Sequence, residues 1–560
     1  MPLMSGKRAF LALLLQEGAE YLFGNPGTTE LPLMDGLVEE TGLRYVLGLQ
    51  EAVVVAMADG YAQASGKLAV VNVHVAPGLG NALGMLYDAQ KAGAPLLVTA
   101  GQHDQTFNVT EPILWADLPP IARPFVKWST EVRRLADLPR VVHRAAKTAL
   151  APPAGPVFVS LPADVLQAEG DVELGAPTRV AARIRGDRAA VEAAAELLAR
   201  AERPLIIAGD AVAQSDAHAE LCAVAELLGA PVYAEGIANT ASFPASHPLF
   251  RGTFVRVAPA IRQLFSQADV LFSVGGDLLT LSLPSDLDPM PPDLQIVHLD
   301  LDPWELGKNY PTPVAILGDP KATLPDLHAA LEARLTPARR ARARARLEET
   351  RVAKARHREE LAAKARAEAQ RSPIAPLALM HAVAEALPPE AVVVDETISS
   401  GAGLRTFLRS EDPKSFFGLR GGGIGWGLPA TVGVKLALPH RPVVGLVGDG
   451  SAMYTCQALW TAAHYRVPVT IVILNNGSYR ILKQRIHAMK GLAAQTDRYV
   501  GMDLDDPRID WVGLAASLGV PAERVEKVAD LAPVLGRAMA APGPTLIDVP
   551  LDPSFKPERL

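Results

Sequence analysis

The chain has 560 residues and a formal net charge of −7, with 54 Lys and Arg against 61 Asp and Glu. At about 150 residues per domain this length predicts three or four domains, and 49% apolar residues supply a core for each. The acidic balance excludes a protein devoted to nucleic-acid phosphates, so we expect no nucleic-acid partner. The only thiols, Cys222 and Cys456, exclude a disulfide framework and a multi-cysteine metal site, and they favour a reducing cytoplasm.

No apolar run reaches the roughly 18 residues that a membrane span needs, so we expect neither a membrane span nor a membrane partner. The basic pair Lys7-Arg8 before the apolar stretch 9–15 imitates a signal peptide. Acidic residues follow at once, however, and no small-residue cleavage site is present. Phe10, Leu13 and Leu14 instead fall on one face of a predicted amphipathic helix.

Short β-branched runs alternate with longer Ala- and Leu-rich helical stretches along almost the whole chain. The predicted strands are 68–75, 95–100, 156–161, 204–208, 270–274, 295–299, 391–394, 443–447, 469–474 and 545–549. Such alternation predicts parallel sheets with helices on both faces. Because parallel strands are covered on both faces, runs such as 469–474 are apolar throughout and not at every second position.

Two shifts in composition predict domain boundaries. Residues 170–185 mix Gly, Pro, Thr and charge, which is typical of a linker. Residues 336–371 are rich in Ala, Arg, Glu and Lys, which predicts a long solvated helix; the alternative, a basic binding arm, is disfavoured because interleaved Glu offsets the Arg. A weak repeat between 57–78 and 428–450 indicates duplication of one α/β unit or the βα rhythm alone. We expect an α/β fold with three doubly wound parallel-sheet domains, at 1–170, 186–335 and 373–560, and a helical linker at 336–372.

Polar residues follow two of the predicted strands near the end of the chain. Gly448-Asp449-Gly450 follows strand 443–447, and Asn475-Asn476 follows strand 469–474. The carboxyl ends of parallel strands are where ligands bind, so Asp449 and Asn476 are expected to meet at one sheet edge. A carboxylate, an amide oxygen and a main-chain carbonyl near Ser478 are hard ligands suited to Mg²⁺. The two glycines and the following helix N-terminus favour phosphate, so the arrangement suits a metal that clamps a diphosphate.

These motifs resemble those of the thiamine diphosphate enzymes, whose signature is a Gly-Asp-Gly followed just under thirty residues later by Asn-Asn. The resemblance extends over the whole chain, with domains in the order pyrimidine-binding, central and diphosphate-binding. It is similar to the 2-oxoacid decarboxylase and acetohydroxyacid synthase branch, and within it to the benzoylformate decarboxylases. The supporting segments are 23–32, 49–52, 58–62, 423–429 and 458–463.

The resemblance implies how thiamine diphosphate would be bound and activated. Glu51 is implied to hydrogen-bond the aminopyrimidine ring and to drive it toward its imino tautomer, which calls for an acid in an apolar pocket. Gly422 is implied to accept a hydrogen bond from the aminopyrimidine through its carbonyl. Ile424 is implied to force the cofactor into its V shape, although a core role is an alternative.

The metal and the diphosphate are implied to be held by the third domain. Asp449, Asn476 and Ser478 are implied to bind Mg²⁺. Ser399 and Ser400 are candidates for diphosphate contacts, with helix capping as the alternative. The remaining implied cofactor contacts are Gly448, Gly450, Ser451, Asn476, Ser478 and Tyr479.

The substrate is implied to be handled by residues of the first domain. His74 ends a predicted strand where the related decarboxylases have a proton relay, and an imidazole suits that role near neutral pH. Thr28 stands where the same enzymes have a serine that binds the substrate carboxylate. His103 is a weaker candidate for the active site.

The chain departs from the benzoylformate decarboxylases at two places. Those enzymes have a second catalytic His in the central domain, where this chain has Ser282. Arg480, Lys483 and Arg485 stand where an aryl pocket calls for apolar residues. Such side chains bind a further carboxylate or phosphate, or they project into solvent, and we favour solvent.

We expect non-oxidative decarboxylation of a 2-oxo acid, dependent on thiamine diphosphate and Mg²⁺, with carboligation of the intermediate as a further outcome. The alternative is an acetolactate synthase-like carboligase without FAD, because 275–283 lacks the Arg-Phe-Asp pattern that resembles the flavin segment. A non-catalytic subunit is disfavoured because the implied site residues are all present. A Rossmann dehydrogenase is disfavoured because 421–425 lacks the strand, fingerprint helix and acidic residue. The resemblance also implies a homodimer at minimum, and we expect a homotetramer in the cytoplasm.

Overall fold

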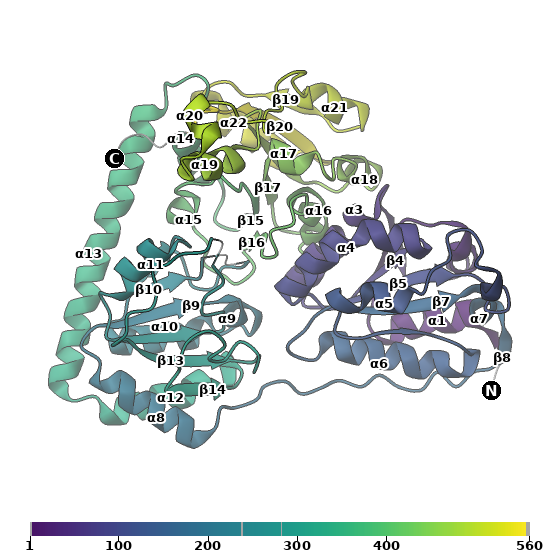
Figure 1. The fold of residues 1–560 in the computed structure, drawn as a ribbon, viewed down its shortest axis with the longest axis horizontal. Coiled ribbons are helices and arrows are strands. Elements are labelled where there is room, and N and C mark those ends of the chain that lie inside the picture. The colour runs from purple at the N-terminus through teal and green to yellow at the C-terminus, as the bar shows by residue number, and fades with distance from the viewer. Residues whose placement is uncertain (1–2, 237–238, 282, 556–560) are drawn as a thin grey trace.

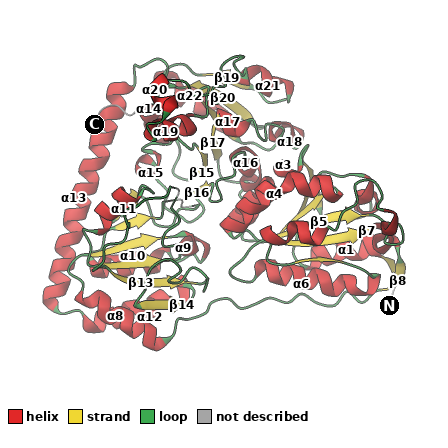
Figure 2. Cartoon of the chain, in the orientation of Figure 1, coloured by secondary structure: helices red, strands yellow, loops and turns green. Residues whose placement is uncertain are grey.

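The computed structural model describes residues 3–236, 239–281 and 283–555. Three six-stranded sheets form three lobes, and every strand pairing within these sheets is parallel. Figure 1 shows the lobes at the corners of a triangle, and Figure 2 shows helices on both faces of the sheets. The expected α/β class with three doubly wound parallel-sheet domains is thereby confirmed.

The first sheet is ordered β3-β2-β4-β5-β7-β6. One face packs against α3, α4 and α5, and the other against α1 and α6. The predicted amphipathic helix is α1, in which Phe10, Leu13 and Leu14 are buried. The strands are β2 (Tyr21–Gly24), β3 (Arg44–Leu47), β4 (Ala69–Val73), β5 (Leu96–Gln102), β6 (Ser129–Glu131) and β7 (Val157–Pro162), and β1 (Leu3–Ser5) pairs separately with β8 (Glu169–Asp171). The helices are α1 (Gly6–Gln16), α2 (Leu31–Leu37), α3 (Glu51–Ser65), α4 (Val75–Ala92), α5 (Leu118–Ala122), α6 (Leu138–Leu150) and α7 (Ala163–Gln167).

The central sheet has a different order, β11-β10-β9-β12-β13-β14: successive strands are added on one side of β9 up to β11 and on the other side from β12 onward. Helices α8, α10 and α12 cover one face and α11 covers the other. The strands are β9 (Pro204–Ala208), β10 (Val232–Ala234), β11 (Phe250–Thr253), β12 (Val270–Val274), β13 (Gln295–Asp300) and β14 (Val314–Leu317). The helices are α8 (Arg188–Arg200), α9 (Asp210–Gln214), α10 (His218–Leu228), α11 (Ala258–Phe265) and α12 (Pro320–Arg334).

The third sheet is ordered β16-β15-β17-β18-β20-β19, which is the strand order of the first sheet when each is numbered along its own chain segment. This shared topology is what duplication of one α/β unit would produce. The strands are β15 (Val392–Glu396), β16 (Phe416–Gly418), β17 (Val443–Gly448), β18 (Thr470–Asn475), β19 (Ala522–Arg524) and β20 (Thr545–Pro550). The helices are α14 (Pro376–Ala386), α15 (Leu404–Phe407), α16 (Gly427–Ala437), α17 (Asp449–Ala452), α18 (Ala458–His464), α19 (Arg480–Ala488), α20 (Leu492–Thr496), α21 (Trp511–Ser517) and α22 (Val528–Ala540).

Two long segments connect the lobes. Residues 172–187 form no helix or strand and run from the first lobe to the central one, whereas 170 and 171 of the predicted linker belong to β8. Helix α13 (Pro337–Glu368) runs along the outside from the central lobe to the third, where the composition predicts a helical connector (Figure 1). In the described part of the chain, no helix is both long and apolar enough to cross a membrane.

A continuous apolar core joins the first and third lobes through helices α3 and α16. A Cβ added at Gly60 would lie 2.5 Å from the carbonyl oxygen of Ala430, and one added at Gly433 would lie 1.9 Å from that of Met57. Only glycine permits this close approach of the two backbones. Because Met57 meets Gly433 and Gly60 meets Ala430, the two helices run antiparallel.

Candidate functional site

The carboxyl edge of the first sheet brings together residues from three strand ends. A short 3₁₀ helix (Thr28–Glu30) follows β2, His74 follows β4, and Gly101 lies at the end of β5. Strands β2 and β5 both pair with β4, so these ends are neighbours. The backbone is strained here, because the β-branched Val75 has a φ of 37° directly after His74. Such strain is typical of functional sites.

A buried carboxylate, Glu30, organises this edge. His74 Nδ1 lies 2.8 Å from Glu30 Oε2, and the amides of Gly27 and Gly101 donate to the same carboxylate at 2.9 and 2.8 Å. The hydroxyl of Thr29 donates to Glu30 Oε1 at 2.8 Å and lies 3.3 Å from His74 Nδ1. Because an ionised carboxylate only accepts, this pairing assigns the proton to Nδ1 and leaves Nε2 for chemistry.

Sequence reasoning missed Glu30 and placed Thr28 at this position. The structure places Thr28 on the exposed side of the turn, while its neighbour Thr29 is buried against His74. In the sequence, Glu30 is marked only by its position two residues after Thr28. In the structure its carboxylate accepts a hydrogen bond from Gly27 N, which closes the turn. His103, the weaker candidate, donates from Nε2 to the carbonyl of Ile113 at 2.8 Å.

Glu51 begins α3 and is 6% exposed. Its Oε1 accepts from the Asn25 amide at 3.2 Å and its Oε2 from the Asn81 amide at 3.0 Å. The expected apolar surroundings are therefore only partly present, because two amide donors face the carboxylate. Gly78 leaves room for it, since a Cβ there would lie 3.0 Å from Glu51 Oε1.

The carboxyl edge of the third sheet carries a second group of polar residues. Strands β17 and β18 are adjacent, with Gly448 opposite Leu474, so Asp449 and Asn476 emerge side by side. Asp449 is 2% exposed, its Oδ2 accepts from Gly477 N at 2.9 Å, and burial raises its pKa to about 6. Asn476 Oδ1 accepts from the amide and hydroxyl of Ser478 at 3.1 and 3.0 Å.

The loop before α16 presents Gly422 and Ile424. Gly422 is exposed, its φ is 88°, and a Cβ there would meet nothing within 4 Å, so this glycine serves conformation and not packing. Ile424 is only half-buried, which argues against a simple core role. Three buried acids hold the loop. Asp88 accepts a hydrogen bond from Gly423 N at 3.0 Å, and Asp59 accepts one from the Trp426 indole at 2.7 Å. Glu396 accepts from Gly425 N and Gly427 N at 2.7 and 2.5 Å.

The two groups lie at opposite ends of the α3–α16 pair. Glu51 precedes Gly60 by nine residues, or about 13 Å of helix, and Gly60 packs near the start of α16. The loop that carries Gly422 directly precedes the start of α16. This loop is bonded to Asp88 on α4, and Asp88 lies 14 residues after His74, which corresponds to about 20 Å of helix. Within one chain, Glu51 and His74 therefore do not face Gly422 and Ile424.

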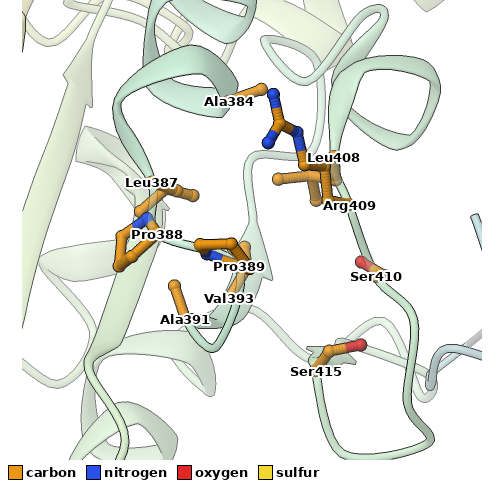
Figure 3. A pocket seen from close by; sticks show the side chains of 10 residues that line it. All are labelled: Ala384, Leu387, Pro388, Pro389, Ala391, Val393, Leu408, Arg409, Ser410 and Ser415. Atoms are coloured by element: carbon orange, nitrogen blue, oxygen red, sulfur yellow. The ribbon is translucent and has the colours of Figure 1, made fainter. Parts of the chain in front are cut away.

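The small cavity shown in Figure 3 belongs to neither group. It holds about 20 Å³, enough for about one water molecule. It lies between the end of α14 and residues 408–415, at the amino edge of the third sheet, away from the strand ends that carry Asp449 and Asn476.

Comparison with known proteins matches all three lobes in chain order. Residues 4–113 match the N-terminal TPP binding domain of the thiamine pyrophosphate enzymes, 191–327 the central domain and 399–549 the C-terminal TPP binding domain. A benzoylformate decarboxylase of Pseudomonas aeruginosa is 33% identical over 541 residues, which cover 96% of this chain and 97% of that protein. The chain belongs to the thiamine pyrophosphate enzymes. It is therefore an enzyme dependent on thiamine pyrophosphate, also called thiamine diphosphate.

Other relatives of this thiamine pyrophosphate enzyme divide between two activities. An acetolactate synthase of Mycobacterium bovis is 31% identical, covering 96% of this chain and 86% of that protein. The solved structure of a thiamine diphosphate-dependent 4-hydroxybenzoylformate decarboxylase of Rhodococcus jostii superposes with a TM-score of 0.85 at 31% identity, covering 99% of this chain and all of that one. A benzoylformate decarboxylase structure from Polynucleobacter necessarius superposes with a TM-score of 0.86 at 29% identity, covering 99% of this chain and all of that one.

The residues at the third sheet edge fit a diphosphate. The hydroxyl of Ser400 is buried without a hydrogen-bond partner, which is the condition expected of a donor whose acceptor is a ligand. A Cβ at Gly448 would meet no atom closer than 3.8 Å, so that side of the turn is open. Gly450 packs against the Tyr479 ring instead, which a Cβ would approach to 2.7 Å. Ser399 uses its carbonyl to accept from Arg480 at 2.9 Å.

The donor set also fits Mg²⁺. Asp449 and Asn476 supply one carboxylate and one amide oxygen, and the Ser478 carbonyl is a third hard oxygen nearby. Among the described residues, no three His, Cys, Asp or Glu side chains gather to hold a metal. A site with one carboxylate therefore depends on amide, main-chain and phosphate oxygens for the rest of its ligands.

The basic residues after Tyr479 were expected to project into solvent. This expectation is wrong for Arg480 and Lys483, whose side chains are buried, with exposed fractions of 8% and 9%. Arg480 donates to the carbonyls of Asp552 and Ser399, and Lys483 pairs with Asp503, so both are structural ties. Ser282 lies outside the described residues.

Proposed function

We propose that this enzyme uses thiamine diphosphate and Mg²⁺ to remove CO₂ from a 2-oxo acid and to release an aldehyde, as a benzoylformate decarboxylase does. One observation carries the proposal: His74, held by Glu30 through Nδ1, is at the same sheet edge as Glu51. An aldehyde forms only if a proton reaches the carbon that has lost CO₂, and a fixed imidazole supplies that proton. The similarity over the whole chain to decarboxylases of aryl 2-oxo acids supports this choice.

The third domain holds the cofactor in this proposal. Asp449, Asn476 and the Ser478 carbonyl would hold Mg²⁺, whose charge would offset that of the diphosphate. The other contacts are Ser399, Ser400, Gly448, Gly450, Ser451 and Tyr479 around the diphosphate, with Gly422 and Ile424 at the rings. When bound, thiamine diphosphate would supply a nucleophilic carbon and an electron sink for the decarboxylation.

The first domain supplies the proton chemistry. Glu51 would exchange a proton with the aminopyrimidine, and the Asn25 and Asn81 amides fix its carboxylate for this role. With both ring nitrogens protonated, His74 would donate its Nε2 proton to the carbon that becomes the aldehyde, while Glu30 keeps the Nδ1 proton in place and the ring is left neutral. Thr28, exposed at the same edge, binds the substrate carboxylate through its hydroxyl.

The site is assembled from two copies in this proposal. Because the two groups lie at opposite ends of the α3–α16 pair, a second chain is needed to bring Glu51 opposite Gly422 and Asp449. A homodimer is then the minimum, and a closed pair of dimers gives the expected homotetramer.

We also propose domain boundaries near residues 170, 186, 335 and 373. We propose that the enzyme acts in the cytoplasm, where the two free cysteines would stay reduced.

An acetolactate synthase-like carboligase without FAD is the second candidate, favoured by the 31% identity to such a synthase. In that case the carbon that lost CO₂ attacks a second carbonyl and is not protonated. In the central sheet the strand order reverses between β9 and β12, which is where dinucleotides bind in such sheets. A Cβ at Gly209 would lie 2.3 Å from the Gly275 carbonyl oxygen, so the two turns are already in contact.

The test measures CO₂ release from pyruvate, 2-oxobutyrate, benzoylformate and phenylpyruvate with thiamine diphosphate and Mg²⁺, with products identified by mass spectrometry. The proposal predicts an aldehyde from an aryl 2-oxo acid. An acetohydroxyacid from pyruvate would instead establish the carboligase. No CO₂ from any of the four, despite cofactor binding, would contradict both candidates for these substrates.

A further inference from the structure

Arg420, directly before the Gly421–Gly425 loop, leaves its own domain and enters the carboxyl edge of the central sheet. Its Nη1 contacts the carboxylate of Glu235 and lies 2.8 Å from Asp210 Oδ2, and its Nη2 lies 3.9 Å from Asp277 Oδ2. These acids follow β10, β9 and β12. The Arg420 side chain is 18% exposed. It therefore ties the start of the loop to three strand ends of the central domain.

The carboxylates that receive Arg420 are themselves fixed. Asp210 Oδ1 accepts from the amides of Asn239 and Thr240 at 2.9 and 3.0 Å and from the Thr240 hydroxyl at 2.7 Å. Glu235 Oε2 accepts from Asp277 N at 3.1 Å. The Asn239 carbonyl accepts from Gly418 N at 2.7 Å, two residues before Arg420. The receiving site is thus rigid and already bonded to the strand that leads into the loop.

Three consecutive glycines separate Arg420 from Ile424, and a run of glycines has more conformational freedom than any other sequence. Gly423 at the end of the run, and Gly425 and Trp426 after it, are held by buried acids, as described above. Before the run, the tie is the Arg420 side chain. Gly422 itself is exposed, so its orientation depends on the contacts at the two ends of the loop.

We propose that Arg420 is a positioning residue: its ion pairs with Asp210 and Glu235 fix the loop that presents the Gly422 carbonyl and Ile424 to the cofactor. The inference rests on the proposed function for what the loop does. It gives the central domain a part in the reaction, because that domain anchors the loop. The planar guanidinium suits the role: Nη1 contacts the carboxylates of Asp210 and Glu235, and Nη2, the other arm of the fork, faces Asp277 Oδ2 at 3.9 Å. An ammonium is instead a single point charge.

The test substitutes Arg420→Lys, which keeps a positive charge among the acids and removes the fork. The matched control is Arg358→Lys: Arg358 of α13 ties that helix to the third domain by donating to the Thr406 carbonyl at 3.0 Å, and it belongs neither to the loop nor to the group that receives Arg420. In cofactor-free protein, hydrogen–deuterium exchange of a peptide covering 419–427 is measured for both variants. Calorimetry with Mg²⁺ then measures the dissociation constant of thiamine diphosphate.

Arg420→Lys is expected to raise amide exchange in 419–427 at least tenfold and to weaken thiamine diphosphate about tenfold, while the control changes neither. Millimolar guanidinium is expected to reverse both effects in Arg420→Ala. Unchanged exchange and affinity in a folded Arg420→Lys protein would overturn the proposal, as would exchange that rises equally throughout the central domain. A wild-type protein that binds no thiamine diphosphate would defeat the proposed function instead, and the exchange of 419–427 would still decide whether Arg420 orders the loop.

Discussion

Glu30 keeps a proton on Nδ1 of His74, because its carboxylate accepts a hydrogen bond from that nitrogen. Glu30→Gln retains the size but replaces one acceptor oxygen by a donor, which disturbs the tautomer of His74. We expect kcat to fall about 100-fold or more, with the affinity for thiamine diphosphate unchanged.

Glu17 offers a matched control, since it also accepts from a histidine Nδ1, that of His143 at 2.5 Å, away from the site. Glu17→Gln is expected to lower Tm but not kcat. Equal loss of kcat in the two variants, measured at equal cofactor saturation, would show that the Glu30 effect is only structural.

Glu51 tests activation separately from substrate handling. Glu51→Gln keeps an acceptor oxygen but has no proton to exchange, so turnover is expected to be nearly abolished while thiamine diphosphate binds within about tenfold of wild type. Stopped assays and calorimetry on the same protein provide both quantities. Turnover at the wild-type rate would remove Glu51 from the mechanism.

Helix packing between α3 and α16 positions the first and third domains. Gly433→Ala places a methyl group against the Met57 carbonyl, and such overpacking costs about 1–3 kcal/mol. We expect a fall in Tm of several degrees. Gly536→Ala on the exposed side of α22, where a Cβ would meet nothing within 4 Å, is the control and is expected to leave Tm unchanged or raise it. Equal Tm in the two variants would contradict this packing.

The contact of α4 with the Gly422 loop makes stability depend on pH. Burial raises the pKa of Asp88 from its ordinary 3.8 to about 8, so the folded chain retains a proton that the unfolded chain has lost. The free energy of unfolding therefore contains a contribution from that proton, which is complete below the ordinary pKa of 3.8, decreases as pH rises, and is lost above about 8. Asp88→Asn does not titrate, so we expect wild type to lose about 1–3 kcal/mol relative to it between pH 5 and 9. Parallel Tm curves over this range would contradict the argument.

Strands that are marked by their own residue pattern could be predicted from the sequence. Strands that depend on pairing with a distant segment could not. Strands β9 and β12 match their predicted bounds, because each is a short apolar run between polar residues. Three-residue strands such as β16 and β19 have too little pattern to recognise, and their existence depends on pairing with β15 and β20.

The candidate site divides in the same way. Motif residues such as Asp449 and Asn476 could be predicted from strand ends, and adjacent strands do bring them together. Glu30 was missed because its partner His74 is 44 positions away, and Asp88 because Gly423 is 335 positions away. Arg480 was misjudged because its burial depends on carbonyls at 399 and 552.

At the scale of the whole molecule, the two outer sheets share one strand order, and each carries candidate site residues at its carboxyl edge. The antiparallel packing of α3 on α16 turns these edges to opposite ends, so the proposed site is divided into two halves within one chain. In the proposed homodimer, a second copy related by a two-fold axis would provide both missing halves at once. The central claim is that catalysis requires Glu51 of one chain and Asp449 of another.

Complementation tests this claim most directly. Chains carrying Glu51→Gln and Asp449→Asn are each expected to form inactive homodimers. In a randomly mixed population half of the dimers are heterodimers, and each of these has one intact site of two, so CO₂ release with the preferred 2-oxo acid should recover to about a quarter of the wild-type rate. A purified heterodimer as inactive as its parents, beside an active wild type, would contradict the account.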